Sequence, residues 1–205
     1  MRAATALFLG FGLLAAPAAA QEVALTATRS GTAAPLQLWA SYGDGGWSVR
    51  VADDRGRERQ RFMVRSEVAD PPPWLADADG DGAADLWVPA MTGTANTTYA
   101  VWTMQPRDGR FRAAGEVSGL IFARDPGGWL VAQGRNGCCA VNLVFHAVSR
   151  RDGTLREAFA IERALAPDGT ARSCTPRGRV PQDVLRPWCA SHSAEALPPG
   201  VVALR

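Results

Sequence analysis

Short runs of alternating apolar residues, separated by Asp-Gly or Gly-rich turns, constrain the fold of this 205-residue chain more than any other feature. Two such runs flank the turn at 43–46, namely Leu36, Leu38, Ala40 and Trp47, Val49, Val51. Asp-Gly pairs at 108–109, 152–153 and 168–169 separate further runs: 99–104 from Phe111, 141–148 from Leu155, and 159–165 from Ala171. A period of two predicts strands with one buried face, and Asp-Gly is typical of hairpin turns. The chain is therefore expected to be all-β, built from successive antiparallel hairpins.

The arrangement of these hairpins stays open between a propeller-like fold and a sandwich. No repeat of fixed period is strong enough to count blades. After residue 20 we find no stretch with a convincing helical pattern, and we expect at most a turn at Pro181–Leu185.

An acidic, glycine-bearing loop runs directly into the apolar residues 86–88. Its carboxylates stand at alternating positions: Asp77, Asp79, Asp81 and Asp85. Ca²⁺ takes about six to eight oxygen ligands at roughly 2.3–2.6 Å, which a tight loop supplies by turning alternate side chains and one backbone carbonyl toward a common centre. The spacing predicts a calcium site formed by these four carboxylates and the carbonyl of Ala83.

This loop differs from an EF-hand. The twelfth position, where an EF-hand has a bidentate Glu, is Val88, and Pro71–Pro73 precede the loop where a helix would be needed. The alternative is a solvated Asp-Gly turn without an ion. We favour the metal site because four carboxylates within nine residues repel one another, and a dication relieves that repulsion more fully than water. Such a site is usually scaffolding.

The amino terminus has the pattern of a secretory signal peptide: Arg2, an apolar run from Leu7 to Leu14, and the small residues Ala18–Ala20 before Gln21. The apolar run is too short to span a bilayer. We expect residues 1–20 to be this signal and residues 21–205 to form a single all-β calcium-binding domain. The mature protein is expected to be periplasmic or secreted, with no membrane span.

Four cysteines follow the signal: Cys138, Cys139, Cys174 and Cys189. Disulfides are the default in an oxidising compartment, and paired C-x-x-C knuckles that would indicate zinc are absent from the sequence. Because a bridge between adjacent residues closes a strained ring, we expect Cys138 and Cys139 each to bridge one of the two later cysteines.

The formal net charge of +2 argues against general binding to nucleic acid or membranes. Arg55, Arg57, Arg59 and Arg61 alternate and would share one strand face. We favour a solvated hairpin face over a phosphate-binding stripe. Among the seven tryptophans, those inside expected strands are assigned to the core (Trp39, Trp47, Trp87, Trp102), while those beside Pro or Gly are candidates for exposure (Trp74, Trp129, Trp188).

Nothing in the sequence indicates catalysis. The chain has no G-x-S-x-G elbow, H-E-x-x-H helix or P-loop, and His146 lies in an expected strand where a catalytic role is disfavoured. A glycosidase stays open as an alternative because its two carboxylates need only be close in space. We predict a non-enzymatic protein with no catalytic residues.

The segment Thr92–Thr98 is small, polar and uncharged. It is either an ordinary connector or a protruding recognition loop that enters a partner's cleft. In the second interpretation, the nearby calcium site would stabilise the base of the loop.

Residues Asp77 to Leu86 resemble the D-x-D-x-D-G-x-x-D-L calcium loops of FG-GAP or VCBS-type repeats, found in integrin-like propeller blades. Further positions extend the similarity to periplasmic calcium-binding proteins related to inhibitors of invertebrate-type lysozyme: Asp85–Pro89, Gly93 with Asn96 and Tyr99, Trp102, and Asp108–Phe111. Some of those proteins act as immunity proteins against lysozyme-like effectors of type IV secretion. The similarity covers roughly residues 77–164.

In those inhibitors, a small Ser-Gly-containing loop with a nearby Tyr enters the lysozyme active site. The resemblance implies that Thr92, Gly93 and Tyr99 contact a partner, together with Thr94 and Asn96 of the same loop. Here Thr replaces Ser, and the loop before Tyr99 is longer.

The sequence therefore predicts an exported, Ca²⁺-stabilised, disulfide-bonded protein that inhibits a lysozyme-like peptidoglycan hydrolase, as an immunity protein in one form of this hypothesis. The alternative is a carbohydrate- or surface-protein-binding module of FG-GAP/VCBS type without inhibitor activity.

Overall fold

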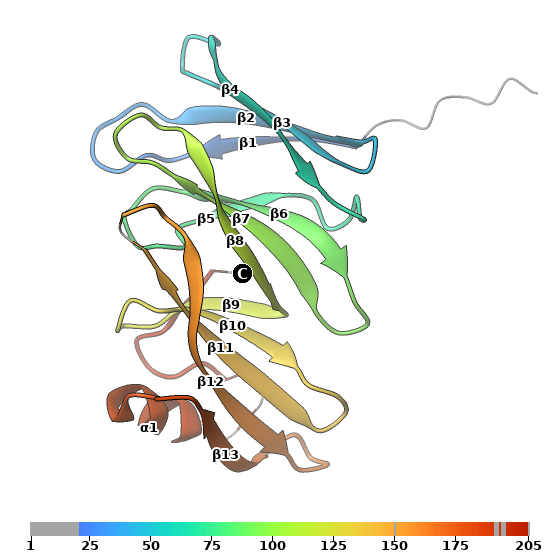
Figure 1. The fold of residues 1–205 in the computed structure, drawn as a ribbon, viewed down its shortest axis with the longest axis vertical. Helices are drawn as coiled ribbons and strands as arrows, with labels where there is room; N and C mark the ends of the chain where they lie inside the picture. The colour runs from blue at the N-terminus through green and yellow to red at the C-terminus, as the bar shows by residue number, and fades with distance from the viewer. Residues whose placement is uncertain (1–20, 150, 191–192, 194–195, 205) are drawn as a thin grey trace, which may run out of the picture.

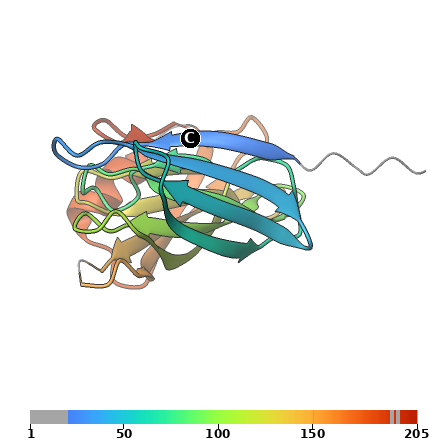
Figure 2. The ribbon, with the colours of Figure 1, turned by 90° about the horizontal axis from the view of Figure 1, so that it is seen from above.

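The computed structural model describes residues 21–149, 151–190, 193 and 196–204, so the expected signal peptide lies outside the described residues. Three antiparallel sheets are stacked along the long axis of the molecule (Figure 1). The first contains β1 (Glu22–Ala27), β2 (Leu36–Gly43), β3 (Gly46–Ala52) and β4 (Glu58–Arg65) in chain order. Viewed down the stack, this sheet is the outermost layer (Figure 2).

The middle sheet is also a meander in chain order, made of β5 (Trp74–Ala76), β6 (Asp85–Thr92), β7 (Thr97–Met104) and β8 (Phe111–Gly119). The third sheet has the order β13-β12-β11-β10-β9-β14, with β9 (Ile121–Arg124), β10 (Leu130–Arg135), β11 (Ala140–Val148), β12 (Leu155–Leu165), β13 (Ala171–Arg177) and β14 (Val202–Ala203). The helix α1 (Gln182–Ala190) packs against this sheet. The all-β prediction is confirmed, whereas a propeller arrangement stays a prediction.

The predicted hairpins are confirmed. β2 and β3 pair from Gln37↔Ala52 to Gly43↔Gly46, and the alternating apolar residues of both strands are buried. The three Asp-Gly turns connect β7 to β8, β11 to β12, and β12 to β13, and each turn glycine has a positive φ. The arginine run lies at the exposed β3–β4 hairpin, where Arg57 pairs with Asp53 and Arg61 with Glu58, as expected for a solvated face.

Two apolar clusters lie between the three sheets, and a third packs α1 against the third sheet. Side chains of the first two sheets form one cluster, which includes Trp47, Leu86 and Phe111. Trp87 and Phe122 belong to a second cluster between the middle and third sheets. Strand β6 is therefore buried on both faces, because Leu86 and Trp87 point to opposite sides of the sheet. This explains why residues 86–88 form a continuous apolar run rather than an alternating one.

The helix α1 was not predicted, because Pro187 interrupts its pattern. Val184 and Trp188 lie one turn apart and pack against the third sheet, and this burial outweighs the proline. Trp188, a candidate for exposure, is completely buried, and its Nε1 donates a hydrogen bond to Asp125 Oδ2 at 2.9 Å. The exposure expected for Trp188 is wrong.

The predicted disulfide pairing is also wrong, although all four cysteines are bridged. Cys138 bonds Cys139, with 3.8 Å between their Cα atoms, and Cys174 bonds Cys189. The adjacent pair lies in the turn between β10 and β11, where the chain reverses. The second bridge joins β13 to α1 and thereby attaches the helix to the third sheet.

The two bridges differ in how much they restrict the unfolded chain. Cys174 and Cys189 are separated by 15 residues, so their bridge is expected to contribute about 3 kcal/mol to the free energy of unfolding. The Cys138–Cys139 bridge encloses no other residue. We predict a loss of about 3 kcal/mol for Cys174→Ser/Cys189→Ser and a much smaller loss for Cys138→Ser/Cys139→Ser, measured by urea unfolding. Equal losses would contradict this assignment.

Candidate metal centre and recognition hairpin

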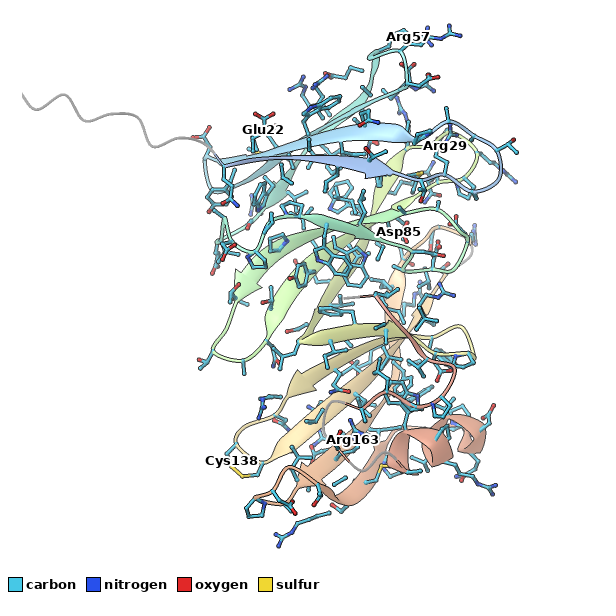
Figure 3. All side chains as sticks on the ribbon, turned by 180° about the vertical axis from the view of Figure 1, so that it is seen from behind. Glu22, Arg29, Arg57, Asp85, Cys138 and Arg163 are labelled. Carbon is cyan, nitrogen blue, oxygen red and sulfur yellow. A yellow bond between two sulfur atoms is a disulfide. The ribbon has the colours of Figure 1, made fainter. Side chains whose placement is uncertain are left out.

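The acidic loop is the connection of a β-hairpin. β5 and β6 pair antiparallel from Trp74↔Trp87 to Ala76↔Asp85, so residues 77–84 must reverse the chain. Gly80 and Gly82 make this possible with φ values of +79° and +83°, which L-residues with a side chain rarely adopt. The loop lies at the edge of the middle sheet where β6 begins (Figure 3).

Backbone amides inside the loop orient its carboxylates. Asp77 accepts hydrogen bonds from the amides of Gly80 and Gly82, Asp79 Oδ1 accepts one from Asp81 N at 3.1 Å, and Asp81 Oδ1 accepts one from Ala83 N at 2.7 Å. Successive Asp side chains therefore turn the chain around a common region, as Asx-turns do.

Three of the predicted ligands are brought together. Asp77, Asp79 and Asp85 each offer an oxygen, and these oxygens lie within 4.8 Å of one another. Asp81 is outside this trio, but its Oδ2 is buried and has no hydrogen-bond partner within the described part of the chain. The Ala83 residue is buried, and its carbonyl stays a predicted ligand.

Asp85 also has a structural role. It is fully buried, its Oδ2 accepts a hydrogen bond from Ala78 N at 2.8 Å, and its Oδ1 accepts one from Met104 N at 2.7 Å. The carboxylate thus joins the start of the loop to the end of β7. Without Asp85, the amides of Ala78 and Met104 would lack a hydrogen-bond partner, which would lower the stability of the fold. Asp85 therefore serves the fold as well as the acidic cluster.

Burial and mutual repulsion make the cluster electrostatically unfavourable without a counter-charge. Burial raises the pKa of Asp79 to about 6, and the negative charge of Asp81 adds to this effect. Burial likewise raises the pKa of Asp85 to about 8, with Asp79 adding and the hydrogen bond from Met104 opposing. A bound dication would favour the ionised forms and reverse these shifts.

Arg124 supplies a nearby positive charge that sequence reasoning did not identify. Its Nη1 lies 3.5 Å from Asp77 Oδ1. The guanidinium crosses the loop at Gly80, where a Cβ atom would lie 1.8 Å from Nη2. Because 47 residues separate Arg124 from Asp77, no local pattern reveals this contact.

These residues fit a hard divalent cation, since the donors are oxygens only and one buried carboxylate oxygen lacks a partner. When bound, the ion would supply charge neutralisation at Asp77, Asp79 and Asp85. Its identity as Ca²⁺ stays a prediction.

The predicted recognition loop lies at the opposite end of β6. The eight residues of this strand separate Asp85 from Thr92 by about 24 Å. The acidic loop is therefore one strand length away from the base of this loop, so any stabilisation by a bound ion would have to act through β6. The loop is the tight β6–β7 hairpin turn, closed by a hydrogen bond from Gly93 N to Asn96 O at 2.8 Å.

The predicted contact residues differ in exposure, from the exposed hairpin tip to the buried Tyr99. Thr92, Gly93 and Thr94 are exposed. Asn96 is held in place because its side chain accepts a hydrogen bond from Arg135 N at 2.9 Å and donates one to Arg135 O at 3.0 Å. Tyr99 is only 4% exposed and packs edge-to-face against Trp74, which removes its side chain from the surface that the hairpin presents.

A cleft of about 490 Å³ opens beside the acidic loop. Its walls include Asp79, Asp81, Gln105, Arg124 and Ser149. The cleft is polar, and its lining combines the loop, the end of β7 and the turns that follow β9 and β11, on one side of the stack.

Comparison with protein-family models, curated proteins and solved structures found no match for this chain. Within the described residues, no helix has both the length and the apolar composition needed to cross a membrane.

We predict that calcium weakens the dependence of the melting temperature on pH. Asp79 and Asp85 have a normal pKa near 3.8 when unfolded and raised values of about 6 and about 8 when folded. Between the unfolded and folded pKa values, the unfolded state binds fewer protons than the folded state. In a chelator, the melting temperature should therefore fall from pH 5 to pH 8. Calcium should raise it, and more at pH 8 than at pH 5, by about 5 °C or more at saturating ion. A calcium-independent melting temperature at both pH values would exclude the site.

The substitution Asp79→Asn removes the negative charge of this side chain and keeps its size and shape. In chelator at pH 8 the variant should melt at or above the temperature of the parent, because it removes a buried charge beside Asp81. In calcium it should lose at least half of the ion-induced increase, because one ligand charge is gone. Calorimetric titration and thermal melts check both signs. Asp54→Asn, at an exposed position outside the loop, is the control and should change neither.

Proposed function

We propose that this protein is an exported, divalent-cation-stabilised binding protein that inhibits a lysozyme-like peptidoglycan hydrolase through the hairpin Thr92–Asn96. The observation that carries the proposal is the combination of exposed, small, polar residues at the hairpin tip with the two hydrogen bonds that hold Asn96 to Arg135. An inhibitory loop needs both properties, since it must enter a cleft and must already be ordered.

The chemistry of the tip suits a carboxylate-lined groove. Glycoside hydrolases of this kind use a pair of carboxylates that flank the scissile bond. The hydroxyl groups of Thr92 and Thr94 and the local backbone amides are donors, and hydrogen bonds to a carboxylate are stronger than neutral ones. With Tyr99 in the core, these donors replace the aromatic contact that the family resemblance implied.

In this proposal the cation acts on the fold and not on the partner. The acidic loop and the hairpin lie at opposite ends of β6, which is buried on both faces. A cation in the acidic loop would stabilise the middle sheet and so preserve the conformation of the hairpin at the far end.

The compartment supports this proposal. Two disulfides fit a protein outside the cytoplasm, where thiols are oxidised. A peptidoglycan hydrolase is met there, in the periplasm or beyond the cell. An immunity role would follow if the target is a toxin delivered by a competitor.

The cleft beside the acidic loop favours a second candidate function, the binding of a carbohydrate by an FG-GAP/VCBS-type module. Asp79, Asp81 and Gln105 line this cleft and could hydrogen-bond sugar hydroxyls. Retention of glycans that Asp79→Asn abolishes, without any effect on hydrolase turnover, would support this candidate over the inhibitor.

We predict that the protein reduces turnover of a lysozyme at stoichiometric concentration, in a panel that includes an invertebrate-type enzyme. Thr92→Ala/Thr94→Ala should weaken inhibition at least ten-fold, because both exposed hydroxyls are lost while the backbone of the hairpin is kept. Thr26→Ala is the matched control, since Thr26 is exposed in β1 and should be neutral. The proposal fails if turnover is unchanged across the panel.

A further inference from the structure

Two other turns lie on the same side of the molecule as the Thr92–Asn96 hairpin. Thr97 of β7 pairs with Gly119 at the end of β8, and the amide of the next residue, Leu120, donates to Gln133 O of β10 at 2.7 Å. The β8–β9 turn and the β10–β11 hairpin therefore lie beside the β6–β7 hairpin (Figure 1). Asp85 and Cys138, which mark the two ends of the strands, lie on opposite sides of the stack (Figure 3).

Asn96 fixes the relative position of the two hairpins. Its amide forms two hydrogen bonds with the backbone of Arg135, across 39 residues of sequence. The approach is so close that a Cβ atom at Gly134 would lie 2.8 Å from Asn96 Oδ1. Gly134 therefore permits the contact, and the two tips form one surface.

Apolar side chains stand exposed on this surface. Met91 is 49% exposed and Leu120 is 52% exposed, and among the described residues only Met63 and Val202 are comparable large apolar side chains. Met91 pairs with Thr98, and Thr98 pairs with Ser118 two residues before Leu120, so both side chains flank the hairpin. Exposed apolar residues beside an ordered polar tip are typical of protein contact surfaces.

Arg135 adds a positive charge to the same place. The residue is exposed, and in the described part of the chain no carboxylate is within ion-pairing distance of its guanidinium. The nearest residues of the β6–β7 hairpin, 92–98, carry no charge. The guanidinium is thus available for a bidentate contact with a carboxylate of a partner.

We infer that Arg135, Leu120 and Met91 form, with the Thr92–Asn96 hairpin, one surface that docks onto a protein groove containing a carboxylate and an apolar wall. This inference rests on the proposed function and deepens it. Arg135 contacts an acidic residue at the groove, while Leu120 and Met91 cover its apolar rim. The partner is thereby recognised by two hairpins, not by one inserted loop.

The test measures the dissociation constant, by calorimetry, of the calcium-loaded protein with the lysozyme that it inhibits best in the panel above. Arg135→Glu should weaken binding at least ten-fold, and Arg135→Gln should weaken it less and reduce the dependence of binding on salt. Leu120→Ser should weaken binding about five-fold or more. Each variant is first compared with the parent by its melting temperature.

Two matched controls lie on the opposite side of the stack, away from the Thr92–Asn96 hairpin. Arg110 is an exposed arginine of the β7–β8 turn, and Val202 is 61% exposed in β14, paired with Arg124. Arg110→Glu and Val202→Ser should change binding less than two-fold. If these controls weakened binding as much as Arg135→Glu, the partner would contact the protein elsewhere. The inference would then be wrong.

The outcomes separate the inference from the proposed function. If the parent inhibits and Thr92→Ala/Thr94→Ala weakens inhibition, but Arg135→Glu and Leu120→Ser bind like the parent, the two-hairpin surface is wrong and the proposed function stands. If the parent inhibits no member of the panel, both are wrong. Loss of binding in Arg135→Glu and Leu120→Ser, with unaffected controls, supports both.

Discussion

A buried carboxylate at the start of β6 is the constraint on which the middle of this molecule depends. Asp85 is fully buried and accepts amide hydrogens from Ala78 and Met104, so it joins the acidic loop to the end of β7. Asp77 and Asp79 lie beside it. Because burial opposes the charged form, the loop is less stable when these carboxylates are ionised, and protons or a cation would offset that cost.

Antiparallel pairing then separates the acidic loop from the hairpin that we propose for recognition. A meander alternates its turns between two ends, and β6 carries the acidic loop at one end and the Thr92–Asn96 hairpin at the other. The strand between them is packed on both faces, with Leu86 in one cluster and Trp87 in another. A close-packed strand resists deformation, so in our proposal order at the acidic loop supports order at the hairpin without contact between a bound cation and the partner.

Local patterns in the sequence predicted the features that depend on interactions between residues close in the chain. The period of two, the Asp-Gly turns and the alternating carboxylates each act within a few residues, and the hairpins and the acidic loop follow from them. The failures at Tyr99 and Trp188 have a different cause, because their exposure depends on which distant segments pack together in the tertiary fold. The cysteine pairing was missed for a local reason, since Cys138 bonds its neighbour Cys139 within one turn. Pro187 likewise lowered the helical signal of α1, although packing of Trp188 outweighs it.

The same limit explains why the two most informative arginines were missed. Arg124 reaches Asp77 across 47 residues, and the backbone of Arg135 is bound by Asn96 across 39. Each approach requires a glycine, Gly80 or Gly134, whose missing side chain leaves the space. The charge of Arg124 is directed inward to the acidic loop, whereas the charge of Arg135 stays exposed at the opposite end. Arg135 has its backbone held by Asn96, and no carboxylate among the described residues pairs with its guanidinium. An exposed charge of this kind is suited to a partner, and for this reason we propose that recognition takes place at the Arg135 end of the molecule.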